Sequence, residues 1–120
     1  GGGEEDDEED EIQGITSHAV LEAEIAACDA QLAALGTAQP DKAQDVQFRR
    51  DGLDLRKQEI ESQIECGFLN QEGYLRLLKD ALAKERQTAG VKKAAGDREG
   101  AVRCLRRYKV MEQELKDATA

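Results

Sequence analysis

The segment SHAVLEAEIAACDAQLAALG, residues 17 to 36, decides the fold class. Its larger apolar residues recur at alternating steps of four and three, which is the a/d spacing of a heptad seam. Thr16 or Ser17 can cap the start of a helix here, and Gly36 supplies a C-terminal stop. The segment therefore predicts a helix over about residues 17–35 with one narrow apolar seam. The seam residues are Leu21, Ile25, Cys28, Leu32 and Leu35.

The same kind of punctuation divides the rest of the chain into three more helices. Pro40 and Asp41 open the next one, with Asp41 as the N-cap and Gln44 three residues on in a capping-box position. Asn70 opens another. The run from Lys92 to Asp97 combines a helix end, a glycine terminator and a new N-cap, which is typical of a tight helical hairpin turn. The predicted helices span about residues 41–66, 71–95 and 98–117.

The composition favours long helices over a compact aromatic core. The chain has no Trp, two Phe, two Tyr and one Pro, and 36% of its residues are charged. Such a sequence suits helices that meet along narrow seams and keep most of their surface in water. Short connections require antiparallel neighbours. We therefore predict an all-α fold of about four helices, arranged as elongated antiparallel hairpins over 14–66 and 67–120 or as a coiled-coil bundle.

The predicted helix over 41–66 has apolar residues on two opposed faces. At 100° per residue, Val46, Leu53, Ile60 and Ile64 fall on one face, while Phe48, Leu55 and Cys66 fall almost opposite. Because the preceding helix can cover only one of these faces, the other needs a second neighbour. We expect the second hairpin to fold back over Phe48 and Leu55 in a monomer, and a homodimer is the alternative.

Acidic residues are concentrated at the N-terminus. Residues 4–11 hold eight of the 26 acidic side chains and account for most of the net charge of −9. An unbroken run of like charge repels itself and cannot bury apolar surface. We therefore predict an acidic disordered arm over residues 1–13. Two roles stay open for it, a solubilising linker or an electrostatic partner for a basic protein or for this chain's own basic region.

The basic region extends from Lys84 to Lys109 and contains nine Lys and Arg residues but only three acidic ones. We expect it to bind helical or acidic segments of other proteins, tubulin tails included, or an anionic membrane surface. The plain alternative is that the region is only a solvated helix face. Nucleic acid is disfavoured, because the whole chain is acidic and exposed aromatics for stacking are lacking. The candidate partner-binding residues are Phe48 and Leu55 together with Lys92, Lys93, Arg103, Arg106 and Arg107.

No catalytic residue, cofactor or metal site is predicted. The sequence has no GxxxxGK[ST], GxGxxG, GxSxG or HExxH pattern. Its cysteines, Cys28, Cys66 and Cys104, form no CxxC and have only His18 as a nitrogen partner, which disfavours zinc and favours small buried hydrophobes or free thiols. An odd cysteine count without a signal peptide favours a reducing, cytoplasmic setting. The Gly1 start without Met suggests a segment of a longer protein.

One stretch carries a resemblance to known proteins. The sequence KAAGDREGAVRCLRRYK, residues 93–109, resembles hairpins in which a helix ending Lys-x-x-Gly-Asp is followed by Ala-x-x-x-Leu-Arg-Arg-x-Lys. Such hairpins are similar to those of coiled-coil and C2 domain scaffold proteins and, more distantly, to the basic helices of charged multivesicular body proteins. The similarity covers residues 74–115. It implies a non-catalytic eukaryotic scaffold at centrosomes or cilia or, alternatively, an adaptor in endosomal membrane traffic.

Overall fold

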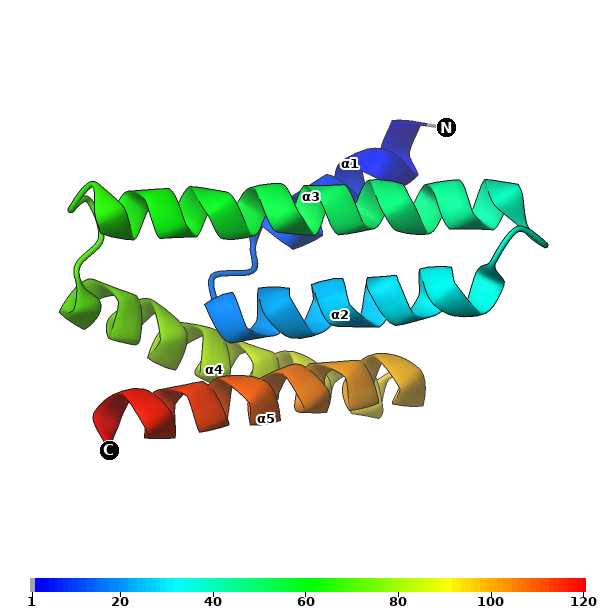
Figure 1. Cartoon of the computed structure of the whole chain (residues 1–120). Helices are drawn as coiled ribbons and strands as arrows, with labels where there is room; N and C mark the ends of the chain where they lie inside the picture. The colour runs from blue at the N-terminus through cyan, green and yellow to red at the C-terminus, as the bar shows by residue number, and fades with distance from the viewer. Residues whose placement is uncertain (1) are drawn as a thin grey trace. The chain divides into compact units, whose positions relative to one another are not determined.

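The computed structural model describes residues 2–120, with side chains described from Glu8 onward. The described residues form helices and no strand, which confirms the predicted all-α class. One more helix is present than the four expected from the sequence. The helices are α1 (Gly2–Gln13), α2 (His18–Leu35), α3 (Pro40–Glu65), α4 (Gln71–Ala94) and α5 (Arg98–Thr119) (Figure 1).

The chain divides into two compact units, Gly1–Phe68 and Leu69–Ala120. The first unit holds α1, α2 and α3, and the second holds α4 and α5. The division lies close to the boundary at residues 66 and 67 that the helix punctuation predicts. Each unit contains one antiparallel helical hairpin, formed by α2 with α3 and by α4 with α5.

Local capping fixes the start of α2, whereas α3 begins differently from the prediction. The Ser17 hydroxyl accepts a hydrogen bond from the backbone N–H of Val20 at 3.1 Å, as an N-cap should. The predicted Asp41 N-cap of α3 is wrong, because the helix begins at Pro40 with Gln39 in the cap position and no side-chain cap bond. Proline suits the first helical position, since it has no N–H that would need a partner.

The core of the first hairpin lies along the predicted seam. Leu21 of α2 and Leu53 of α3 are both 0% exposed, and Ile25 and Ile60 are buried beside them. Fully burying a leucine side chain contributes about 1.5–3 kcal/mol. The buried residues of α2 lie between Val20 and Cys28, in the half of the helix away from the turn, whereas Leu32 near the turn is only half-buried.

The acidic N-terminal segment is helical, so the predicted disordered arm is wrong over the described residues 2–13; Gly1 lies outside them. Ile12 is 6% exposed, and α1 packs against α3. A Cβ atom added to Gly52 of α3 would lie 3.3 Å from Ile12 Cδ1, so the two helices approach closely there. The prediction considered the charge run alone. It did not include the apolar contact of Ile12 or the positive charge of Arg49 on α3.

The second hairpin begins and turns at the predicted residues. The Asn70 side chain accepts from the N–H of Gly73 at 2.8 Å, and that of Asp97 accepts from the N–H of Gly100 at 2.9 Å. Gly96, between the helices, has a φ of 85°, which glycine adopts without strain. The residues buried between the helices are Leu78, Ala89, Ala101, Cys104 and Met111.

Candidate functional site

Arg49, a half-buried arginine that the sequence analysis did not single out, forms ion pairs that join the helices of the first unit. The Arg49 guanidinium of α3 lies 3.2 Å from a carboxylate oxygen of Glu8, 3.3 Å from one of Glu11 and 3.0 Å from one of Glu24. Burial by itself would lower the pKa of Arg49, but the hydrogen bonds and charges of these three carboxylates outweigh it and raise the pKa. Arg49 therefore stays charged and binds α1 and α2 to α3.

Further polar contacts set the register of α2 against α3. Arg50 Nε donates to Asp29 Oδ1 at 2.7 Å near the turn, and His18 Nε2 lies 3.6 Å from Glu61 Oε1 at the opposite end. Both pairs join residues whose numbers sum to 79, as an antiparallel hairpin about one turn requires. These contacts position the helices, and no group among them is arranged for catalysis.

The face of α3 that carries Phe48 and Leu55 is uncovered within its own unit. Phe48 is 62% exposed and Leu55 is 60% exposed, while Leu53 and Ile60 on the opposite side are buried against α2. The two-faced interpretation of this helix is therefore confirmed at Leu53 and Ile60, but it is wrong at Ile64, which is 44% exposed. The expected fold-back of the second hairpin over Phe48 concerns the placement of the two units and stays a prediction.

The five basic residues predicted to bind a partner differ in exposure. Some are exposed, and others lie partly buried in the hairpin of α4 and α5. Lys93, Arg103 and Arg106 are exposed, whereas Lys92 and Arg107 are half-buried. Lys92 Nζ lies 4.0 Å from Asp97 Oδ2 at the turn. Lys92 and Arg107 thus contribute to the hairpin itself. We define the basic stripe as the three exposed residues, Lys93, Arg103 and Arg106.

The cysteines are free thiols in two different environments. Cys28 and Cys104 are buried and Cys66 is exposed. Burial raises the pKa of the Cys104 thiol, and a hydrogen bond to Glu85 raises it further. Burial likewise raises the pKa of Cys28, although the positive charge of Arg49 opposes the change. A thiol with a raised pKa is a poor nucleophile at neutral pH, so neither buried cysteine suits covalent catalysis.

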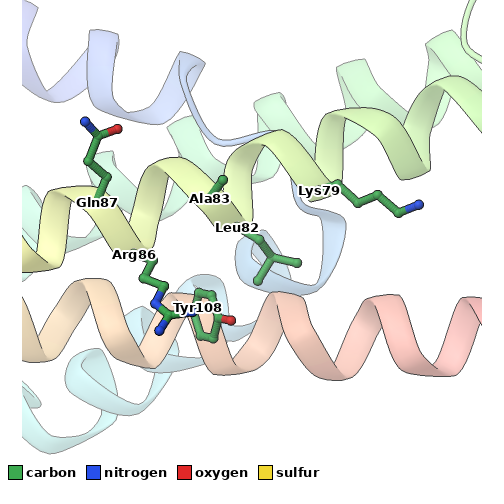
Figure 2. Close-up of a pocket in the computed structure, with 6 residues that line it drawn as sticks. All are labelled: Lys79, Leu82, Ala83, Arg86, Gln87 and Tyr108. Atoms are coloured by element: carbon green, nitrogen blue, oxygen red, sulfur yellow. The ribbon is translucent and has the colours of Figure 1, made fainter.

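A shallow groove runs along one side of the second hairpin (Figure 2). Leu82 of α4 and the Tyr108 ring of α5 supply its apolar floor, and Lys79 and Arg86 of α4 supply positive charge. In Figure 2 the side chains of Leu82 and Arg86 extend from α4 toward α5. The sequence did not predict this groove, because Lys79 lies outside the basic region that begins at Lys84. Only the pairing of α4 with α5 brings these residues together.

The described part of the chain shows neither a metal site nor a membrane-spanning helix. Among the side chains that the structure describes, which begin at Glu8, no cluster of three or more His, Cys, Asp or Glu could hold a metal ion. None of the described helices is both long enough and apolar enough to cross a membrane. Comparison with protein-family models, with curated proteins and with solved structures gave no match. The resemblance of residues 74–115 to scaffold hairpins therefore stays a prediction.

Proposed function

We propose that this chain is a non-catalytic scaffold module of a larger eukaryotic protein, and that it binds other proteins through helix surfaces. The observation that carries the proposal is the exposure of Phe48, Leu55, Arg103 and Arg106 on helices whose opposite sides are buried in hairpins. The backbone that carries these side chains is already ordered in the packed helices, so a partner has only the side chains to order.

The basic stripe on the second hairpin suits an acidic partner surface. Arg103 and Arg106 are three residues apart, so they lie on the same side of α5. Arginine binds carboxylates bidentately, which makes acidic protein segments such as tubulin tails suitable partners. A cytoplasmic scaffold at the centrosome or cilium is the specific form of the proposal, and the resemblance of residues 74–115 supports it.

Microtubule co-sedimentation tests this form of the proposal. The Arg103→Glu, Arg106→Glu double variant should lose binding, because it replaces two cations by two anions opposite an acidic surface. The matched control is Arg76→Glu, Lys116→Glu, which makes the same charge change at exposed positions of the same hairpin. Equal binding by the two variants would show that the stripe is only a solvated helix face.

A second form of the function, an adaptor in endosomal membrane traffic, is favoured by one feature of α5. Val102 and Leu105 are each 45% exposed, and Arg106 lies four residues after Val102, on the same side of the helix. Apolar and basic side chains side by side suit the interface of an anionic membrane. Co-sedimentation with liposomes of anionic lipid, run beside liposomes of neutral lipid, distinguishes this form from microtubule binding. A chain that binds neither anionic liposomes nor microtubules would refute the stripe as a binding site.

A further inference from the structure

The exposed face of α3 has the chemistry of a ligand helix. Phe48 and Leu55 are seven residues apart, which places them on one line about 10.5 Å apart along the helix axis. Asp45 and Asp51 lie three residues before and after Phe48, hence about 60° to either side of it. Both carboxylates are exposed. The face is therefore an apolar pair with a negative charge on each flank.

The groove of the second hairpin has the opposite chemistry. Its apolar floor consists of Leu82 and Tyr108, and the cations are Lys79 and Arg86, both exposed. These two cations are also seven residues apart, about 10.5 Å along α4. Asp45 and Asp51 are separated by six residues, about 9 Å along α3. The two surfaces are thus opposite in charge sign and alike in apolar character.

We propose that the Phe48 and Leu55 face of α3 in one copy of this chain seats in the groove between α4 and α5 of a second copy. An amphipathic helix lying in an apolar groove is a common mode of protein recognition. Each chain carries both surfaces, so two copies bury two apolar contacts and form two sets of charge pairs. Such a reciprocal exchange closes into a dimer with twofold symmetry.

This dimer is distinct from the proposed binding of acidic partners. Arg103 of the basic stripe and Tyr108 of the groove are five residues apart, hence about 140° apart around α5. The stripe and the groove therefore face different directions on the same helix. The loss of one activity need not accompany the loss of the other, so the two proposals fail separately.

Mixing two charge-reversal variants tests the dimer. In the first, Asp45→Lys and Asp51→Lys make the α3 face basic; in the second, Lys79→Glu and Arg86→Glu make the groove acidic. Each variant alone juxtaposes like charges between copies, so its dimer dissociation constant should rise roughly tenfold or more over that of the unmodified chain. An equimolar mixture should restore dimers, because each α3 face then meets a groove of opposite charge in the other variant.

Sedimentation velocity over a range of concentrations, at low salt and again at 0.5 M salt, reads the result. The Arg76→Glu, Lys116→Glu control should dimerise as the unmodified chain does, and circular dichroism checks that every variant keeps its helices. High salt should weaken the dimer, since exposed charges are screened. An unmodified chain that stays monomeric at every concentration would overturn the proposal.

Two further outcomes also count against a second copy as the occupant. A dimer that neither charge-reversal variant weakens would use some other surface. The second outcome involves a chain that carries all four substitutions. If this chain sediments as the unmodified chain does, but the mixture of the two variants does not, the contact forms within one chain. Recovery in the mixture alone distinguishes exchange between copies from closure within one.

Discussion

Arg49 Nη2 lies 3.0 Å from Glu24 Oε2, and the same guanidinium also holds Glu8 and Glu11. One side chain of α3 thereby joins α2 on one side and α1 on the other. The Arg49 side chain is 24% exposed, so these ion pairs are less screened than pairs at the open surface. The attachment of the acidic N-terminal helix depends on this residue and on the nearby Ile12.

Replacing Arg49 by Ala should release α1. The substitution removes the countercharge of three carboxylates, and we expect a loss of about 1–2 kcal/mol in the free energy of unfolding. Chemical denaturation measures that loss, and hydrogen exchange should show faster exchange in residues 8–13 than elsewhere. Arg50→Ala is the control, because the Arg50 pair with Asp29 is exposed and does not involve α1. Unchanged exchange in α1 would contradict the role given to Arg49.

Two leucines in α3 should differ sharply in their contribution to stability. Leu53→Ala leaves a cavity at a site that is 0% exposed, and it should cost about 2–5 kcal/mol. Leu55→Ala removes a side chain that is 60% exposed, so it should change stability by no more than about 0.5 kcal/mol. Urea denaturation of the two variants at low protein concentration compares them in the monomer. Similar losses would mean that the Leu55 face is covered in the monomer.

The three thiols should react at different rates. Alkylation of the native protein near neutral pH should modify Cys66 quickly, because it is exposed, and Cys28 and Cys104 slowly. Mass spectrometry of the digested protein identifies the modified residue. Unfolding in urea should make the three rates similar. Rapid modification of Cys104 in the native state would show that the second hairpin opens readily.

The raised pKa values of Cys28 and Cys104 also set the direction of a pH effect. Below a pH of about 7.5, roughly one unit under the ordinary cysteine pKa, both thiols are protonated in the folded and unfolded chain, so they add no pH dependence. Above that pH the unfolded chain loses these protons first, and stability should fall as the pH rises. Denaturation at pH 8 and pH 10 measures the fall. A Cys28→Ala, Cys104→Ala variant should show a smaller fall between the same two pH values.

The cap of α5 should respond in a predictable order to two substitutions that both remove the charge of Asp97. Asp97→Ala removes the acceptor for the N–H of Gly100 and should cost about 0.5–2 kcal/mol. Asp97→Asn keeps an oxygen acceptor and should retain most of the stability. Thermal unfolding followed by circular dichroism ranks the three proteins. An Asn variant as unstable as the Ala variant would mean that charge near the helix start, and not the cap bond, stabilises α5.

Local sequence signals located the helices that begin at strong N-caps. Ser17, Asn70 and Asp97 each accept the capping hydrogen bond expected of them, because a cap involves only neighbouring residues. The heptad spacing likewise identified Leu21 and Ile25 as core residues. Competition between local signals caused one error, since Pro40 began α3 before the Asp41 cap.

Contacts between residues distant in the sequence decided the rest. The charge run at residues 4–11 predicted disorder by itself, but Arg49, lying 38 residues beyond Glu11, supplies the countercharge that allows α1 to dock. The floor of the groove joins Leu82 to Tyr108 across the hairpin, and Leu105 of α5 is 45% exposed. The sequence alone therefore determined the all-α class and the helix ends with strong caps. The tertiary structure decided which charges pair and which apolar residues stay exposed, because both depend on which helix faces pack together.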